Sequence, residues 1–281
     1  MKKIICLLLS LFIITSCRGY VTSNKSFDSS KDIVILYSNI IPESDNADNV
    51  YAKIINSKEA LLKDTPNVTL VDTGNNPYID KMNEVGYDYA CFGLYDFSEG
   101  LDHLYENTNK AKHKYLLCSA SYNGQTKDIF KKTAPYEIVD YDGIKVGYIG
   151  VFSPRYVEEK PEFFKEGDNT VVNVYNETEE VFYDTVQCSI DKAKDLGANY
   201  IILLSNFDDK EIYTPYTLED LISNLSNVDV VINGNTYTID KQLTLNDKDN
   251  KSVLIVSNGP QSTRFGKVTI SDGKFENGAL D

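Results

Sequence analysis

The sequence has no tryptophan and only two histidines, His103 and His113, among 281 residues. Zinc-type catalytic sites draw heavily on imidazole, so a site built from several histidines is excluded. Positive charge is scarce as well, because 28 lysines and arginines stand against 42 aspartates and glutamates, for a formal net charge of -14. Such a surface does not displace the counterions of phosphate backbones, which argues against nucleic acid as a partner.

An apolar run of signal-peptide length lies at the N-terminus. It covers residues 4–15, follows two lysines, and is too short to cross a bilayer comfortably. The run ends in Ile-Thr-Ser-Cys at Cys17, which resembles the lipobox of bacterial lipoproteins. We therefore expect residues 1–16 to be a signal peptide and Cys17 to be the lipidated residue. An ordinary secretory leader with a chance cysteine is the alternative.

Lipid on Cys17 would attach the protein to a membrane. Diacylglycerol together with an amide-linked acyl chain is enough for stable anchoring. Arg18 follows the cysteine, in place of the aspartate that marks inner-membrane retention in enterobacteria, which favours the outer membrane or the surface of a bacterial cell. Residues 17–31 are polar and serine-rich and are predicted to be a flexible tether.

From residue 32 to residue 281, short apolar runs typical of buried strands alternate with amphipathic segments of helical period. The predicted strands are 33–38, 68–71, 89–92, 114–120, 136–140, 144–151, 200–204, 228–232, 242–245, 252–256 and 267–270. The predicted helices are 45–63, 78–85, 101–112, 177–196 and 218–225. Asp142-Gly143 predicts a hairpin turn, whereas the acidic stretch 154–169 has no periodicity and is predicted to be a loop. The pattern indicates one layered α/β or α+β domain without a second-domain linker.

Cys91, Cys118 and Cys188 remain after the expected cleavage and lipidation. Three thiols cannot all pair within one chain. Cys91 and Cys118 each lie in an apolar, strand-like run, so we predict buried free thiols rather than a disulfide or a reactive nucleophile. Of the two histidines, His103 is predicted to be exposed on a helix and His113 to lie in a loop.

Residues 85–104, VGYDYACFGLYDFSEGLDHL, resemble a segment of the metallophosphoesterases of the 5'-nucleotidase type. In that family a strand leads into a Gly-Asn-His-Glu-Phe-Asp turn at a two-metal site. The glycine and the phenylalanine of the turn keep the family's spacing here. Leu94 stands at the metal-binding Asn, Tyr95 at the catalytic His and Asp96 at the Glu. The structural residues of the turn are therefore kept, while its metal-binding and catalytic residues are replaced.

The first two motifs of that family show the same loss. Residues 36–42 correspond to Leu-His-Thr-Asn-Asp-x-His and retain Asn39, but Ile40 stands at the Asp and Pro42 at the His. Neither of these two side chains can bind a cation. In the second motif, Asn75 replaces the Asp that bridges the metals. A neutral amide cannot balance two dications about 4 Å apart.

The last two motifs have lost their histidines. Asn206 follows Ser205 where the family has Ser-His at a strand end. In residues 229–238, DVVINGNTYT, Asn235 and Tyr237 replace both histidines of Asp-x-x-x-x-Gly-His-x-His-Thr. Five motifs keep the order and spacing of the calcineurin-like 5'-nucleotidase and UDP-sugar hydrolase family. They extend the resemblance to that family over about residues 33–270.

The resemblance implies an α/β fold, namely the four-layer α/β/β/α sandwich of the metallo-dependent phosphatase type, over residues 32–281. Members of the family hydrolyse phosphoric esters with two divalent metals, which are held by loops at the strand ends. Longer members carry a C-terminal domain that stacks a nucleotide base between aromatic rings. That nucleotide-binding domain is expected to be absent from this chain.

Because the ligands are replaced, we predict a catalytically inactive lipoprotein with no catalytic residue and no metal cofactor. Its vestigial cleft would serve as a scaffold that binds a small polar ligand, such as a sugar, or a protein partner. The vestigial cleft positions are Asn39, Ile40, Pro42, Asn75, Leu94, Tyr95, Asp96, Asn206, Asn235 and Tyr237. Two alternatives remain open: a metal-dependent phosphohydrolase of nucleotide catabolism with an atypical site, and a Ca²⁺ or Mg²⁺ site remodelled from asparagine oxygens.

Overall fold

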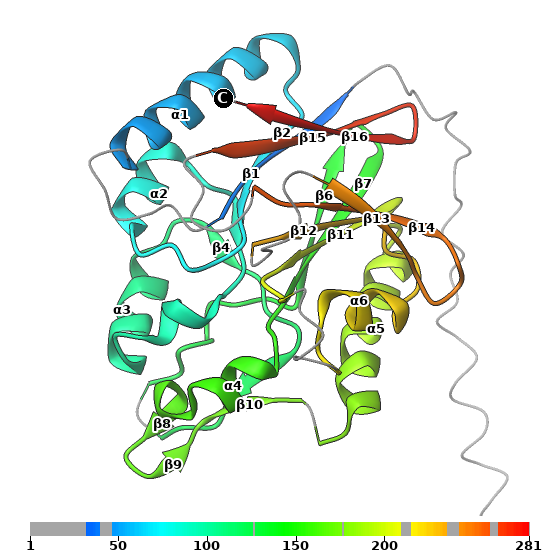
Figure 1. The fold of residues 1–281 in the computed structure, drawn as a ribbon. Coiled ribbons are helices and arrows are strands. Elements are labelled where there is room, and N and C mark those ends of the chain that lie inside the picture. Colours follow the sequence, from blue (N-terminus) through cyan, green and yellow to red (C-terminus); the bar gives the residue numbers. More distant parts are fainter. Residues whose placement is uncertain are drawn as a thin grey trace, which may run out of the picture.

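The computed structural model describes residues 32–39, 47–125, 127–175, 177–208, 215–234, 242–258 and 264–280. Two six-stranded sheets lie face to face, and helices cover the outer side of each sheet (Figure 1). This arrangement is the predicted four-layer α/β/β/α sandwich, so the fold class is confirmed. The predicted signal peptide, Cys17 and the tether lie outside the described residues.

The first sheet has the strand order β16-β15-β1-β2-β3-β4. Its strands are β1 (Ile33–Ser38), β2 (Val68–Asp72), β3 (Tyr89–Ala90), β4 (Lys114–Tyr115), β15 (Phe265–Ser271) and β16 (Lys274–Leu280). Strands β1 to β4 are parallel, and β15 is antiparallel to both of its neighbours. The helices that connect the parallel strands are α1 (Ala47–Asp64), α2 (Ile79–Val85) and α3 (Leu101–Lys110), which lie together on one side of the molecule (Figure 1).

The second sheet has the strand order β13-β14-β12-β11-β7-β6. Its strands are β6 (Tyr136–Tyr141), β7 (Ile144–Val151), β11 (Tyr200–Ser205), β12 (Val230–Asn233), β13 (Gln242–Asn246) and β14 (Ser252–Val256). The four central strands are parallel, and the two edge strands are antiparallel to them. Helices α5 (Glu179–Asp195) and α6 (Leu218–Ser223) lie on the opposite side of the molecule from α1 to α3 (Figure 1).

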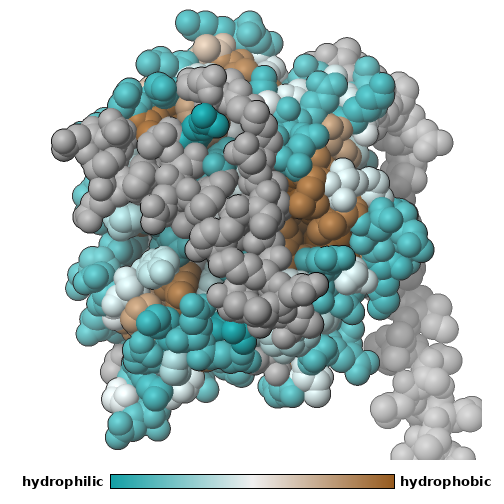
Figure 2. Space-filling model, in the orientation of Figure 1, coloured by the Kyte–Doolittle hydropathy of each residue, from teal (hydrophilic) through white to brown (hydrophobic). Residues whose placement is uncertain are grey.

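Shorter elements fill the connections. They are the 3₁₀ helices Leu94–Phe97 and Pro161–Phe164, α4 (Arg155–Glu159), and two small ladders that pair β5 (Ala120–Tyr122) with β10 (Val172–Val174) and β8 (Lys165–Glu166) with β9 (Asn169–Thr170). None of the helices in the described ranges combines the length and apolar character that a membrane span needs. Hydrophilic residues cover most of the described surface visible in Figure 2, with smaller apolar areas between them.

Alternation along the central strands explains why their apolar runs are continuous. In β1, Ile33, Ile35 and Tyr37 belong to the core cluster between the two sheets, whereas Val34 and Leu36 belong to the cluster on the helix side. All five side chains are buried. A strand that is covered by helices on one face and by a sheet on the other has no solvent-exposed face. Its sequence is therefore a nearly continuous run of apolar residues.

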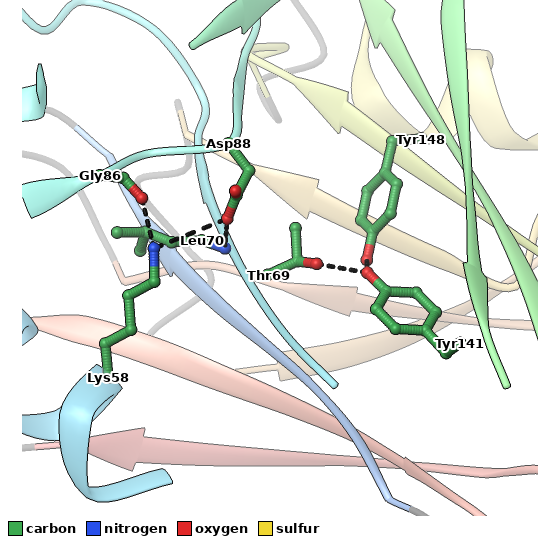
Figure 3. A network of polar contacts seen from close by, with 7 residues as sticks. All are labelled: Lys58, Thr69, Leu70, Gly86, Asp88, Tyr141 and Tyr148. Atoms are coloured by element: carbon green, nitrogen blue, oxygen red, sulfur yellow. Dashed lines mark hydrogen bonds and ion pairs between the residues drawn. The ribbon is translucent and has the colours of Figure 1, made fainter. Parts of the chain in front are cut away.

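Tyrosine hydroxyls join the two sheets through the apolar layer. Thr69 of β2 is hydrogen-bonded to the hydroxyl of Tyr141 in β6, which lies 2.7 Å from the hydroxyl of Tyr148 in β7 (Figure 3). Tyr89 of β3 stacks on Tyr148, with ring centroids 5.3 Å apart. Because the hydroxyls of Tyr141 and Tyr148 are partnered, their burial is compatible with a stable core.

A second set of contacts places the start of β3. The Asp88 carboxylate accepts a hydrogen bond from the backbone of Leu70 in β2 at 2.8 Å (Figure 3). Lys58 of α1 lies 3.8 Å from the same carboxylate and donates to the carbonyl of Gly86. Helix α1 is therefore tied to the strand that leads into the 3₁₀ helix Leu94–Phe97.

Several local predictions are confirmed. Cys91 and Cys118 are buried free thiols, and His103 is exposed on α3. Asp142 has a φ of 55°, so the predicted hairpin uses a left-handed residue that Asp tolerates. His113 lies in a loop as predicted, but it is buried without a hydrogen-bond partner for either ring nitrogen, and burial lowers its pKa to about 4.

Other local predictions are wrong. The stretch 154–169, predicted to be a loop, contains α4, a 3₁₀ helix and the ladder of β8 and β9. A five-residue helix completes too few turns to produce an amphipathic period. The predicted strand 114–120 stops at Tyr115, and only an isolated bridge from Leu116 to Ala134 follows before β5. Strand β3 is shorter than the predicted 89–92, and β16 was not predicted at all.

Candidate functional site

Polar residues at the carboxyl ends of β1, β2, β11 and β12 form the candidate site. In the first sheet the Ser38 hydroxyl donates to the Asp72 carboxylate, and in the second sheet the Ser205 hydroxyl donates to the amide oxygen of Asn233 at 2.7 Å. The backbone nitrogens that follow Asp72 and Asn233 donate to the carbonyls of the two serines, at 3.1 and 2.9 Å. We call Ser38, Asn39, Asp72 and Thr73 the first half-site, and Ser205, Asn206, Asn233 and Gly234 the second half-site. The two sheets thus end in the same local arrangement.

The two half-sites exchange hydrogen bonds. The amide nitrogen of Asn39 donates to the carbonyl of Gly234 at 3.1 Å, and the amide nitrogen of Asn206 donates to the carbonyl of Thr73 at 2.9 Å. Both asparagines are only 1% exposed. Each asparagine follows the serine of one half-site and satisfies a buried carbonyl of the other, so the pair holds the ends of the two sheets together.

Asn75 extends this network toward the 3₁₀ helix Leu94–Phe97. Its side-chain oxygen accepts a hydrogen bond from the backbone of Tyr95 at 2.7 Å, and its amide nitrogen lies 3.4 Å from the side-chain oxygen of Asn206. That oxygen also accepts from the hydroxyl of Tyr156 at 2.7 Å. The side-chain oxygens of Asn75 and Asn206 are therefore occupied by protein donors.

The loop after β2 needs glycine at position 74. Gly74 has a φ of 94°, and a Cβ there would collide with the backbone of Gly93. The close approach brings the loop that follows β2 against the loop that follows β3. As a result Asp96 reaches both loops, and one of its carboxylate oxygens accepts from Gly93 at 2.8 Å and from Asn75 at 2.9 Å.

The two acidic side chains of the site lack a neighbouring cation. Burial raises the pKa of Asp72 to about 6, against hydrogen bonds from Ser38, Asn76 and Gly74 that favour its charged form. Burial, helped by the charge of Asp72, raises the pKa of Asp96 to about 7 against backbone hydrogen bonds from Gly93 and Asn75 that favour its charged form. Among the described residues no ion pair involves either carboxylate. A nearby dication would shift both pKa values in the opposite direction.

Comparisons with known proteins show the fold. A scan against models of protein families finds no match, and neither does a search of curated proteins. A solved structure of the NAD nucleotidase of Haemophilus influenzae matches with a TM-score of 0.66 and 17% identity, over 89% of this chain and 49% of that chain. The 5'-nucleotidase precursor of Thermus thermophilus matches with a TM-score of 0.68 and 16% identity, over 89% of this chain and 54% of that chain.

The calcineurin-like phosphoesterase YfkN of Bacillus subtilis also matches, with a TM-score of 0.59 and 18% identity, over 89% of this chain and 90% of that chain. The fold is that of the 5'-nucleotidase-type metallophosphoesterases. The chain spans about half the length of the nucleotidase structures from Haemophilus influenzae and Thermus thermophilus. At these levels of identity, the likeness concerns the metallophosphoesterase fold alone.

Within the metallophosphoesterase fold, four predicted site residues come together: Asn39, Asn75, Asp96 and Asn206. The side chains of two others make no hydrogen bond in this network, although the backbone nitrogen of Tyr95 bonds Asn75. Leu94 is buried in the hydrophobic core, and the side chain of Tyr95 is 62% exposed. Ile40, Pro42, Asn235 and Tyr237 lie outside the described residues.

Tyr156 is one of several site residues that sequence reasoning missed, with Ser38 and Asn233 among the others. It lies in α4, within the stretch predicted to be a loop, and its buried hydroxyl bonds both the side chain and the carbonyl of Asn206. Nothing in the local pattern distinguishes it from the other 19 tyrosines of the chain, since the count is 20 in all. Thr73 and Gly234 were missed because they take part through their carbonyls, which any residue has.

The described residues do not fit a pair of divalent metals. No group of three or more His, Cys, Asp or Glu side chains in the described ranges could hold a metal ion. Of the asparagine oxygens that would have to serve instead, those of Asn75 and Asn206 already accept hydrogen bonds, and Asn235 lies outside the described residues. The donor set that paired-metal hydrolysis requires is thus not assembled by this part of the metallophosphoesterase fold.

Proposed function

We propose that this chain is a membrane-anchored bacterial lipoprotein that uses a metallophosphoesterase fold for binding and does not hydrolyse phosphoric esters. The observation that carries the proposal is that the side-chain amides of Asn39, Asn75 and Asn206 donate hydrogen bonds to protein oxygens at the ends of the two sheets. In a two-metal site these strand ends supply carboxylates and imidazoles. Here they supply neutral amides whose hydrogen bonds run to protein atoms.

Electrostatics support the same proposal. Burial raises the pKa values of Asp72 and Asp96, and both carboxylates accept hydrogen bonds from protein donors. These donors and the neutral amides beside them differ from the carboxylates and imidazoles with which a two-metal site holds its ions.

The decisive experiment measures metal content and turnover of the full chain, purified in detergent from the membrane fraction of a bacterial expression host. We expect sub-stoichiometric transition metal and no hydrolysis of AMP or of a chromogenic phosphodiester in the presence of Mn²⁺. An active metallophosphoesterase assayed in parallel is the positive control. Stoichiometric metal, or turnover that a chelator abolishes, would establish the atypical phosphohydrolase instead.

The membrane anchor has a separate test. We expect the full chain to partition into the detergent phase of a cloud-point extraction, and the Cys17→Ser variant to partition into the aqueous phase. Cys188→Ser is the matched control, because Cys188 is an exposed thiol of the folded domain and should leave partitioning unchanged. Equal partitioning of Cys17→Ser and the parent chain would contradict the lipid anchor and leave the question of hydrolysis untouched.

A further inference from the structure

A cavity of about 250 Å³ lies beside the half-sites, between the loop that follows β2, the 3₁₀ helix Leu94–Phe97 and α3. Asp96, Glu99, His103 and Tyr115 contribute polar groups to its lining. Ile79 and Leu104 contribute apolar walls. Asn75 and Asp96 of the candidate site also line it, whereas Asn39 and Asn206 do not, so the cavity adjoins the place where the two sheets join.

Tyr115 provides an unsatisfied hydroxyl. The residue is only 6% exposed, and its ring stacks on Phe92 with centroids 4.4 Å apart. Its hydroxyl makes no hydrogen bond with any residue in the described ranges. Unlike the ring nitrogens of His113, however, it is not one of the fully buried polar atoms without a partner in those ranges. The hydroxyl of a side chain this deeply buried reaches open space through the cavity that the residue lines. A hydroxyl that opens onto a cavity and has no protein partner is available to a polar ligand atom.

The cavity has a negative character. The charge of Asp96 raises the pKa of the Tyr115 phenol beyond the effect of burial, so the two groups lie within electrostatic reach. Glu99 adds a second carboxylate, and it forms no ion pair in the part of the chain that the structure describes. No lysine or arginine lines the cavity. Phosphates and carboxylates are therefore repelled from it.

Size limits the occupant further. Pockets for drug-sized ligands span roughly 300 to 1,000 Å³, so a cavity of about 250 Å³ suits a molecule smaller than a nucleotide. A primary ammonium group has three donors and no acceptor. It matches a cavity that offers the carboxyl groups of Asp96 and of the exposed Glu99 together with a phenol oxygen, and a short carbon chain would contact the walls formed by Ile79 and Leu104.

We propose that this cavity binds a small organic ammonium ion, with the ammonium group between the Tyr115 hydroxyl, the Asp96 carboxyl and the Glu99 carboxylate. The inference deepens the proposed binding role, on which it rests. The same chemistry is offered by a free amine and by the lysine side chain of a partner, and the ligands chosen for the test distinguish these two sources.

Isothermal titration calorimetry of the full chain in detergent tests the proposal with five ligands. Butylamine and putrescine represent free amines, and N-acetyl-lysine amide represents a lysine side chain. Butanediol and AMP are the neutral and anionic controls. We expect at least one amine to bind and both controls to fail, and the tighter of the free and lysyl ligands identifies the source. Absence of amine binding, or equal binding of butanediol, overturns the proposal.

Two variants connect binding to the named residues. Tyr115→Phe removes only the unpartnered hydroxyl, and Glu99→Gln removes only a charge that has no ion pair, so both should fold with unchanged thermal stability. Each should weaken amine binding by roughly tenfold or more, because each removes a hydrogen bond to a charged group. Glu106→Gln is the control, since Glu106 is exposed on α3 and does not line the cavity.

Amine binding that neither Tyr115→Phe nor Glu99→Gln weakens would place the ligand elsewhere and contradict the assignment. The outcome is separable from the proposed function, which fails through metal content and turnover. A chain that binds no amine and hydrolyses nothing would refute the ammonium site alone.

Discussion

The first half-site places a carboxylate, Asp72, where the second half-site places an amide, Asn233. Each accepts a hydrogen bond from the serine at the end of the neighbouring strand. Asn233 also exchanges two hydrogen bonds with the backbone of Phe207, accepting from its nitrogen at 2.8 Å and donating to its oxygen at 2.7 Å. Asp72 has no proton to donate when ionised and is surrounded by donors from Ser38, Gly74 and Asn76.

This difference separates the architecture of the site from its charge. The same serine contact, the same backbone contact and the same reciprocal asparagine bond form around a carboxylate in one half and around an amide in the other. Negative charge is thus not needed to shape the strand ends. In a metal-dependent hydrolase charge is needed to hold dications, whereas the fold itself can be kept when amides replace that charge.

The substitution Asn233→Asp should have the largest effect, because it puts charge into the half that lacks it. The Asn233 amide donates a hydrogen bond to the carbonyl of Phe207, and a carboxylate oxygen in its place would repel that carbonyl. Position 233 is only 1% exposed, so water cannot relieve the repulsion. We expect a loss of about 4 kcal/mol in the free energy of unfolding at neutral pH, measured by urea denaturation. The loss should shrink on acidification, because a protonated carboxyl can donate again.

Asn224→Asp is the control for this prediction, since Asn224 is exposed at the end of α6 and should change stability by less than about 0.5 kcal/mol. If Asn233→Asp were as stable as the parent chain at neutral pH, the second half-site would tolerate charge as the first does.

Removing the asparagine that links the halves should have the next largest effect. Asn206→Ala deletes the donor to the Thr73 carbonyl and the acceptor of the Tyr156 hydroxyl. Because these groups are buried, we expect the free energy of unfolding to fall by about 3 kcal/mol. Thermal or chemical denaturation checks the value, with Asn224→Ala as the control at an exposed asparagine. A loss below about 1 kcal/mol would mean that the hydrogen bonds of Asn206 contribute little to holding the halves together, leaving packing and the Asn39 bond.

The pH dependence of stability tests the charge of the site. Asp96 has a pKa of about 7 in the folded protein, above its ordinary value of 3.8, so the folded state binds this proton more tightly than the unfolded state. Its contribution to stability is therefore complete below about pH 4 and is lost as pH rises through about 7. Each unit of difference between the folded and unfolded pKa corresponds to about 1.4 kcal/mol. Because Asp96 is partly exposed, the figure is reduced, and we expect the free energy of unfolding to fall by about 2 kcal/mol.

Asp96→Asn should flatten that part of the profile, because the amide oxygen can still accept from Gly93 and Asn75. Unfolding free energies of the parent chain and the variant, measured between about pH 4 and 8, give the difference. His113, whose pKa is lowered, acts in the opposite direction in both proteins and cancels. Parallel profiles for the two proteins would show that Asp96 does not carry the charge that burial disfavours.

The smallest effects concern the tyrosines that support each half. Tyr156 bonds Asn206 of the second half-site, and the Tyr87 hydroxyl lies 2.8 Å from the Ser38 hydroxyl of the first. Tyr156→Phe and Tyr87→Phe should each lower the free energy of unfolding by about 1 kcal/mol. The double variant should be additive within about 0.5 kcal/mol, since the two hydroxyls share no partner. A larger coupling energy in this double-mutant cycle would show that the two half-sites form one hydrogen-bond network.

Much of the fold could be predicted because its central strands are buried on both faces. The runs that became β1 and β11 are continuous stretches of apolar residues and those of β2 and β7 are mostly apolar, so their type follows from length and composition. The site positions Asn39, Asn75 and Asn206 could be predicted as neighbours because they follow strands of known motifs. Tyr156 and the cavity beside Asp96 could not, because a five-residue helix and a space between loops leave no period in the chain.

One signal for the cavity was present in the sequence. Glu99, His103 and Asn107 are spaced four apart at the start of and along α3, which places them on one side of that helix, and all three line the cavity. His103 is exposed as predicted, yet its exposure alone does not reveal that it faces a cavity. Which loop would cover that side depends on how the segment after β2 folds around Gly74.

The amino-acid sequence alone determined which residue types stand at the strand ends, and hence that amides and aliphatic side chains replace anionic and imidazole donors. Only the tertiary structure decided what those amides do. Hydrogen bonds between residues more than 130 positions apart, such as that of Asn206 with Thr73, require both sheets to be packed before either partner has a position. The local sequence pattern determines the tendency of each segment to form a helix or a strand. The pairing of buried polar groups is determined only when the layers have packed together.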